Sequence, residues 1–205
     1  MQKPLYGLVL SGGKSARMKK DKSLLRYHGK SQVAYCFDLL WPFCQKIFVS
    51  NRKEQARLAD HKEFPQIHDA AKFREAGPLA GILTAMNKFP KAGWLILACD
   101  LPFVDQRVME KLIQSRNRRK LATAYVSTHD GCPEPLCAIY EPNYRTRLNR
   151  FFVEGILCPR KIMMNSPVEL IRQDREGSLD NINDPREYQK AVRQLKQGSM
   201  NAHHA

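Results

Sequence analysis

The regular alternation of strand-like and helix-like segments over the first 115 residues most restricts the fold of this chain. Short apolar runs bounded by turn residues are typical of strands buried on both faces of a sheet. Such runs cover residues 5–10, 46–50, 66–69 and 94–99. Segments with helical start and stop signals alternate with them at 31–41, 52–60, 77–86 and 105–113. This pattern predicts a mostly parallel sheet with helices on both faces, a Rossmann-like three-layer α/β/α sandwich.

The last third of the chain is less regular. Apolar runs over 121–126 and 136–140 predict two more strands, and an antiparallel strand is expected to enter the sheet in this part. The segment 184–187 reads Asp-Pro-Arg-Glu, a capping box with proline at the first helical position, and predicts a final helix. We expect a single domain over residues 1–198 and a tail, which can be disordered, over 199–205.

Composition excludes several classes of protein. Hydrophobic residues make up 43% of the 205 residues, enough for a core. No apolar run reaches the roughly 18 residues of a membrane span, and the first residues lack a signal pattern, so we expect a cytoplasmic protein with no membrane contact. The six cysteines form no CxxC pair, which argues against disulfides and a zinc site. The histidines His28, His61 and His68 lack metal-ligand spacing, and surface or turn roles are expected for them.

A formal net charge of +14 indicates a polyanionic ligand. Nucleic acid and a nucleoside triphosphate both fit, and charge alone does not separate them. The sequence has no recognition-helix, zinc or RNP-type pattern, so no specific nucleic acid is expected. The basic run over 116–120 follows a helix and is expected to be a solvated helix end.

Three of the expected strands end in residues that suit a ligand site. Ser11-Gly12-Gly13 follows the first strand, Asp69 the third and Asp100 the fourth. In an open parallel sheet these ends share one edge, where ligands bind. Glycines allow backbone N–H groups to approach phosphate, and the nearby cations Arg17 and Lys22 would neutralise it.

Each of these features also has a simpler interpretation. The glycines can form a plain turn before a solvated basic loop, since neither the P-loop spacing nor the dinucleotide fingerprint is present. Asp100 can hold Mg²⁺, which prefers one or two carboxylates plus phosphate oxygens, or it can cap the turn before Pro102. Asp69 has the same two interpretations.

The segment from Leu10 to Leu25 closely resembles a known family signature, roughly LAGGxSxRMGxDKxLL, and further segments agree in order and spacing. These are residues 49–52, 67–69, 77–81, 99–102, 135–140 and 181–185. On these residues the chain resembles the molybdenum cofactor guanylyltransferase family over nearly its whole length. Lys19 stands where the family has glycine, and the segment 132–134 is less similar to the family.

The resemblance implies a fold like that of nucleotide-diphospho-sugar transferases and a Mg²⁺-dependent transfer of GMP. The terminal phosphate of the molybdenum cofactor would attack GTP, release pyrophosphate and form the guanine dinucleotide cofactor. By the same resemblance the catalytic residues would be Arg17, Lys22 and Asp100, with the metal on Asp100. The nucleotide would be bound by Leu10, Ser11, Gly12, Gly13, Lys22, Asn51, Asp69 and Asp100, and the acceptor by Asn181 and Asn183.

Two other functions remain compatible with these residues. A nucleotidyltransferase with another base or acceptor, such as a cytidylyltransferase of the same cofactor, would share the glycine loop, Lys22 and Asp100. A basic module that binds nucleotides or nucleic acid without catalysis is an alternative from another class. The sequence leaves open the oligomeric state and any protein partners in cofactor delivery.

Overall fold

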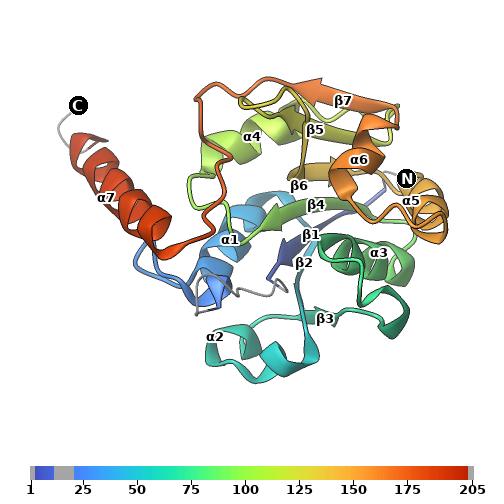
Figure 1. Ribbon diagram of the computed structural model, residues 1–205, viewed down its shortest axis with the longest axis horizontal. Helices are drawn as coiled ribbons and strands as arrows, with labels where there is room; N and C mark the ends of the chain where they lie inside the picture. Colours follow the sequence, from blue (N-terminus) through green and yellow to red (C-terminus); the bar gives the residue numbers. More distant parts are fainter. Residues whose placement is uncertain (1–2, 12–20, 203–205) are drawn as a thin grey trace.

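The computed structural model describes residues 3–11 and 21–202, with side chains through residue 197, and its core is one seven-stranded sheet (Figure 1). The strands run in the order β3-β2-β1-β4-β6-β5-β7. Their bounds are β1 (Leu5–Leu10), β2 (Lys46–Asn51), β3 (Gln66–His68), β4 (Gly93–Ala98), β5 (Ala122–Val126), β6 (Pro133–Tyr140) and β7 (Val168–Ile171). Among these strands β6 alone is antiparallel to its neighbours β4 and β5, which confirms the predicted mostly parallel sheet with an antiparallel strand.

Helices cover both faces of the sheet (Figure 1). Their bounds are α1 (Gln32–Leu40), α2 (Ala59–Lys62), α3 (Pro78–Lys88), α4 (Gln106–Gln114), α5 (Tyr144–Val153), α6 (Pro159–Met164) and α7 (Pro185–Ala202). Short 3₁₀ helices add η1 (Lys22–Leu24), η2 (Trp41–Phe43), η3 (Lys53–Arg57) and η4 (Ala71–Phe73). The helices predicted at 31–41, 77–86 and 105–113 are present as α1, α3 and α4, whereas the helix predicted at 52–60 is split into η3 and α2.

Alternate side chains of the central strand β4 divide the core into two layers. Trp94 and Ile96 face the layer that contains α3, α5 and α6, and Leu95 and Leu97 face the layer that contains α1 and α4. All four side chains are fully buried. This is the three-layer arrangement expected for strands that are apolar on both sides.

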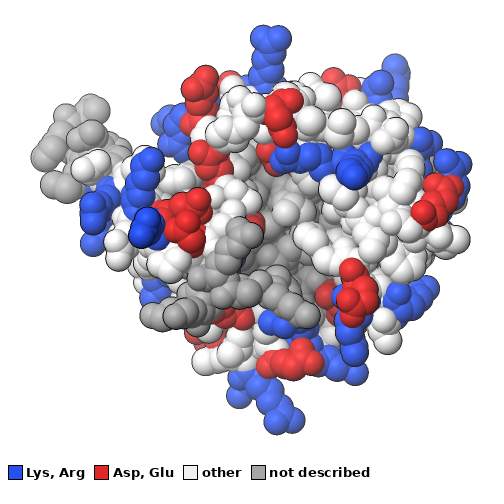
Figure 2. Space-filling view, in the orientation of Figure 1, with Lys and Arg blue, Asp and Glu red and all other residues white. Residues whose placement is uncertain are grey.

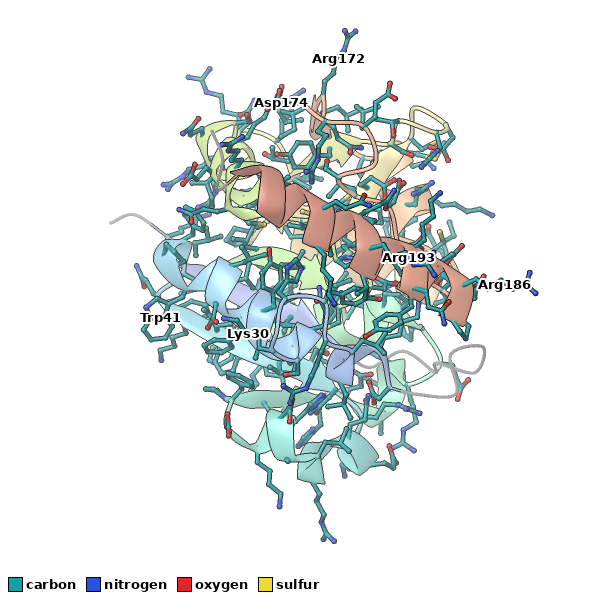
Figure 3. All side chains as sticks on the ribbon, turned by 90° about the vertical axis from the view of Figure 1, so that its left-hand side faces the viewer. Lys30, Trp41, Arg172, Asp174, Arg186 and Arg193 are labelled. Atoms are coloured by element: carbon teal, nitrogen blue, oxygen red, sulfur yellow. The ribbon has the colours of Figure 1, made fainter. Side chains whose placement is uncertain are left out.

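The helix α7 packs on a third, smaller cluster beside the sheet. Its Ala191 meets Leu25, Tyr27 and Ile182, and the rings of Tyr27 and Tyr188 lie 4.9 Å apart. Figure 3 shows α7 running obliquely across this side of the molecule, with Arg186 near the end where the helix begins. The helix therefore fixes the segment that follows residue 20 against the segment that precedes residue 185.

Acidic side chains cap α4 and α7, but the capping box predicted at 184–187 forms only in part, because the Glu187 carboxylate accepts from Asn183 N and not from Asp184 N. Asp105 accepts a hydrogen bond from Val108 N at 3.0 Å and caps α4. Asp184 accepts from the N–H groups of Arg186 and Glu187, and the Glu187 carboxylate accepts from Asn183 N. The helix α7 continues to Ala202, four residues beyond the expected end of the domain at residue 198.

Two expectations about polar residues need correction. Arg116 is not part of a solvated basic run, because its guanidinium is buried and forms two hydrogen bonds, of 2.6 and 3.0 Å, with the Glu141 carboxylate. Gly93 allows this pair to form, since a Cβ there would lie 2.7 Å from Arg116 Nη2. His61 is not a surface residue, because its ring is fully buried.

Candidate functional site

The carboxyl ends of β1, β2 and β4 lie side by side because the three strands are parallel and in register. Leu10 is paired with Ser50 on one side and with Ala98 on the other. The residues that follow these ends line a pocket of about 610 Å³, which we call the strand-end pocket. Five residues predicted for the nucleotide site line it, namely Leu10, Ser11, Lys22, Asp69 and Asp100. Figure 2 shows acidic and basic side chains distributed around the middle of the face that it views.

Gly81 allows α3 to approach the strand ends. A Cβ at this position would overlap Ser50 Oγ and come within 3.0 Å of Leu10 Cδ2. Gly77, just before α3, has a φ of +55°, a conformation that side-chain-bearing residues rarely adopt. Both glycines line the strand-end pocket, so the segment 77–81 shapes one of its walls.

Lys22 and Asp100 lie next to each other in the lining of the pocket. Lys22 Nζ lies 3.5 Å from Asp100 Oδ2 and donates a 2.7 Å hydrogen bond to Asn183 Oδ1. The backbone carbonyl of Asp100 accepts from Ile182 N at 2.9 Å. The structure therefore brings together residues from β4, η1 and the segment before α7 that are far apart in the sequence.

Asp100 has the properties of a metal ligand. Its Oδ1 is buried and meets no hydrogen-bond donor among the residues that the structure describes. A buried carboxylate oxygen without a donor is costly unless a ligand or ion satisfies it. No group of three His, Cys, Asp or Glu residues that could hold a metal occurs within the described ranges. Asp100 alone therefore fits Mg²⁺ best when phosphate oxygens and water complete the coordination.

Asp69 directly follows β3 and also lines the strand-end pocket. Its Oδ1 accepts a 3.3 Å hydrogen bond from Ser50 Oγ. Burial raises the pKa of the Asp69 carboxyl, and the Ser50 hydrogen bond opposes that shift. A carboxylate in this position can accept hydrogen bonds from a ligand that carries N–H or O–H donors.

Asn51 does not line the strand-end pocket. Its side chain is fully buried, and Nδ2 donates to Gln66 Oε1 at 2.9 Å and to His61 Nδ1 at 3.0 Å. Its Oδ1 lies 2.7 Å from His68 Nδ1. Asn51 thus supports the end of β2, and its direct contact with a nucleotide stays a prediction.

Sequence reasoning missed the polar network beneath Lys22. The Asp21 carboxylate accepts from Ser23 N, from Ser23 Oγ and from Gln55 Nε2, and Ser23 Oγ lies 2.8 Å from His61 Nε2. Since the Ser23 hydroxyl donates to Asp21, His61 donates its Nε2–H to Ser23 and accepts at Nδ1. The sequence held one partial signal, an Asp two positions before a Ser at the start of a short helix.

A second pocket of about 930 Å³ adjoins the first, and we call it the acceptor-side pocket. Gly77, Pro78, Asp100 and Leu136 line both pockets. The predicted acceptor residue Asn181 lines the acceptor-side pocket, whereas Asn183 points to Lys22.

Charged side chains from separate elements meet at the wall of the acceptor-side pocket. Arg160 on α6 forms ion pairs with Asp130 at 2.7 Å and with Glu134 at 2.9 Å. His129 pairs with Asp180 at 2.7 Å, and this contact raises the pKa of His129. The pocket wall thus holds both charge signs, and its Arg160 and His129 are paired with carboxylates.

Four residues singled out in the sequence, Gly12, Gly13, Arg17 and Lys19, lie outside the described residues. Their roles stay predictions. The structure also contains, within its described part, no helix long and apolar enough to cross a membrane.

Known proteins resemble this chain both in sequence and in structure. The profile of the family described as MobA-like NTP transferase domain matches residues 7–167. A molybdenum cofactor biosynthesis bifunctional protein from Synechocystis sp. is 39% identical over 187 residues, which cover 91% of this chain and 53% of that protein. This chain therefore spans about half the length of that relative. A molybdenum cofactor guanylyltransferase from Pseudomonas fluorescens is 30% identical over 184 residues, covering 89% of this chain and 90% of that protein.

Solved structures share the fold. Molybdopterin-guanine dinucleotide biosynthesis protein A from Archaeoglobus fulgidus has a TM-score of 0.75 at 24% identity and covers 94% of this chain and 99% of that one. A CMP:2-keto-3-deoxy-manno-octonic acid synthetase complexed with CTP has a TM-score of 0.71 at 11% identity, over 95% and 99% of the two chains. At these identities the likeness concerns the fold alone, which is that of nucleotidyltransferases.

Proposed function

Because this chain belongs to the family of MobA-like NTP transferase domains, and so is a nucleotidyltransferase, we propose that it transfers GMP from GTP to the terminal phosphate of the molybdenum cofactor. An oxygen of the acceptor phosphate attacks the α-phosphorus of GTP, and the bond to the β-phosphate oxygen breaks to release pyrophosphate. The observation that carries the proposal is the position of Asp100, which lines both adjoining pockets beside Lys22.

The division of the two substrates between the pockets follows from their linings. GTP would occupy the strand-end pocket, with its triphosphate toward Lys22 and its base toward Asp69. The cofactor would occupy the acceptor-side pocket, in contact with Asn181. The reacting phosphates would then meet at the shared wall, next to Asp100.

The chain needs no strong general base for this reaction, because the attacking phosphate is already anionic. Its residues contribute positioning and charge neutralisation, and these two effects account for most of the rate enhancement in reactions of this type. Lys22 would neutralise the triphosphate and the departing pyrophosphate, and Arg17 is proposed to do the same. Asp100 would hold Mg²⁺, which when bound would supply positive charge that offsets the negative charge of the phosphates.

A product assay tests the proposal. The protein is incubated with Mg²⁺, molybdenum cofactor and one of GTP, CTP or ATP, and dinucleotide products are identified by mass spectrometry. A guanine product alone is expected. A cytosine product alone would assign the chain to the sister activity, and no product with cofactor that a control enzyme accepts would contradict the proposed acceptor.

A further inference from the structure

Gln55 has a buried carboxamide whose oxygen and nitrogen are both fully engaged. It lies on η3, and only 4% of the residue is exposed. Its Nε2 donates to the Ser11 carbonyl at 3.0 Å and to Asp21 Oδ2 at 2.6 Å. Its Oε1 accepts from Arg52 N at 3.0 Å. A primary amide has two N–H donors, so this arrangement uses its donor capacity completely.

The two acceptors of Gln55 stand at opposite ends of one stretch of chain. Ser11 directly follows β1, and Asp21 directly precedes η1, which begins with Lys22. Ser11 is also held on β2, because its N and Oγ both donate to the Ser50 carbonyl at 2.9 Å. Gln55 therefore ties the start of η1 to a point that the sheet already fixes.

Asp21 transmits this fixed position to Lys22. One of its oxygens accepts from Ser23 N at 3.0 Å and from Ser23 Oγ at 2.7 Å, which caps η1. The other oxygen accepts from Gln55. With donors on both oxygens the carboxylate has one orientation, and the helical turn that carries Lys22 is oriented with it.

We propose that Gln55 is a positioning residue for Lys22, acting through Asp21 and not by contact with substrate. This proposal rests on the proposed function in one respect, namely that Lys22 binds a phosphate group of the substrate. The bond between Gln55 and Asp21 is charge-assisted, and bonds of this kind contribute more than neutral ones. Loss of the amide donor leaves both the Ser11 carbonyl and Asp21 Oδ2 unsatisfied in a buried place.

The variant that tests this is Gln55→Glu. It keeps the size and shape of the side chain, removes the donor and places a carboxylate against Asp21. Hydrogen exchange of the Ser23, Leu24 and Leu25 amides is expected to accelerate about tenfold or more, because their acceptors belong to Asp21 and Lys22. The dissociation constant for Mg²⁺-GTP is expected to rise by a similar factor.

A double variant separates this role from a loss of packing. In Gln55→Glu with Asp21→Asn, the donor and the acceptor are exchanged, since the new amide at position 21 can donate to the new carboxylate at position 55. Part of the exchange protection and of the GTP affinity is expected to return. The Ser11 carbonyl stays without its donor, so recovery is incomplete.

Two controls complete the experiment. Arg57→Gln changes an exposed residue of the same 3₁₀ helix and is expected to leave exchange and affinity unchanged. Leu148→Ala lowers global stability from the core on α5 and is expected to leave GTP affinity unchanged. Unchanged exchange at Ser23 to Leu25 in Gln55→Glu would overturn the proposal, as would a loss of affinity in Leu148→Ala equal to that in Gln55→Glu.

Failure of the proposed function would be visible separately. Hydrogen exchange of the ligand-free protein reports on the link between Gln55 and η1 whether or not GTP is the substrate. Binding of inorganic tripolyphosphate reports on Lys22 without a base. A wild-type chain that makes no guanine product but shows the exchange effect would contradict the proposed function and leave the positioning role of Gln55 in place.

Discussion

Asp100 and His61 both bury polar atoms, but they differ in whether those atoms have hydrogen-bond partners. Asp100 keeps one carboxylate oxygen without a donor among the described residues, at the wall between two pockets. His61 has both ring nitrogens engaged and lies in neither pocket. Because the unsatisfied oxygen of Asp100 lies at a pocket wall, a ligand can satisfy it, whereas the satisfied ring of His61 supports its neighbours.

The Asp100→Asn variant tests the proposed role of Asp100 as a metal ligand. The amide keeps the size of the side chain but removes the charge that is proposed to hold Mg²⁺, so turnover is expected to fall by about 100-fold or more while the protein stays folded. Initial rates of dinucleotide formation and the thermal midpoint measure the two effects. Near-normal turnover would remove Asp100 from the metal role.

His61 is expected to make stability depend on pH. Burial lowers its pKa, partly opposed by the carboxylates of Asp21 and Asp60. The unfolded chain therefore binds this proton more readily than the folded one, and the free energy of unfolding falls as pH drops below about 6.5.

The comparison of wild type with His61→Gln isolates this contribution. The free energy of unfolding of both proteins is measured by urea unfolding at a series of pH values between about 7.5 and 5.5. This range lies around the ordinary histidine pKa. The difference in unfolding free energy between the two proteins is expected to change with pH by at most about 1.4 kcal/mol per unit. A difference that is constant over this range would show that His61 titrates normally in the folded state.

The elements that carry the strand-end pocket were those that the sequence predicted best. The strands β1, β2 and β4 are short apolar runs with turn residues at their ends, so the local signal is complete. The parallel register of these strands and of β3 then places the predicted residues Asp69 and Asp100 at one pocket, which Lys22 of η1 also lines.

The elements and buried residues that sequence reasoning missed differ in how strong their sequence signals were. The edge strand β7 has four residues and no fully buried side chain, so neither an apolar run nor an alternation was visible. The helix α5 did carry a signal, because Tyr144, Leu148 and Phe151 have helical spacing and are all buried. The burial of Arg116, Gln55 and His61 depends on partners 25 or more positions away and has no local signature.

The approach of α3 to the strand ends is expected to depend on Gly81. In Gly81→Ala the added Cβ overlaps Ser50 Oγ, a cost of about 1–3 kcal/mol. This exceeds the roughly 1 kcal/mol gained from the higher helix propensity of alanine. Lower stability and weaker GTP binding are expected, measured by urea unfolding and titration calorimetry.

A second substitution checks the cause. Adding Ser50→Ala removes the hydroxyl that the new methyl group meets, and most of the lost stability is expected to return. If the double variant is as unstable as the sum of the two single ones, the contact with Ser50 is not the reason for glycine at this position.

At the scale of the whole molecule, the buried ion pair of Arg116 and Glu141 joins the end of α4 to the end of β6 beside Gly93. The variant Glu141→Gln leaves the buried guanidinium without its charge partner, and the free energy of unfolding is expected to fall by about 3–5 kcal/mol. Chemical unfolding of the wild type and the variant measures this change in the free energy of unfolding. Replacement of both residues, as Arg116→Met with Glu141→Leu, is expected to recover most of the loss, and failure to do so would indicate a role beyond charge pairing.

The net charge of +14 is expected to speed the encounter with anionic substrates. The value of kcat/KM for GTP should therefore fall as ionic strength rises from about 0.01 to 0.15 M, because the screening length shortens from about 30 to 8 Å. Initial rates at increasing concentrations of a chloride salt measure how kcat/KM depends on ionic strength. The value of kcat at saturating substrate is the control. A salt-independent kcat/KM would show that the charge does not act on substrate encounter.

The bond between Lys22 and Asn183 joins residues 161 positions apart. On a ribosome Lys22 emerges early, but its partner emerges only after β7, the seventh strand, has been made. A nascent chain can therefore complete its sheet while this corner of the substrate site is still missing. A chain whose synthesis stops before residue 183 therefore lacks the Asn183 side chain that accepts a hydrogen bond from Lys22 Nζ.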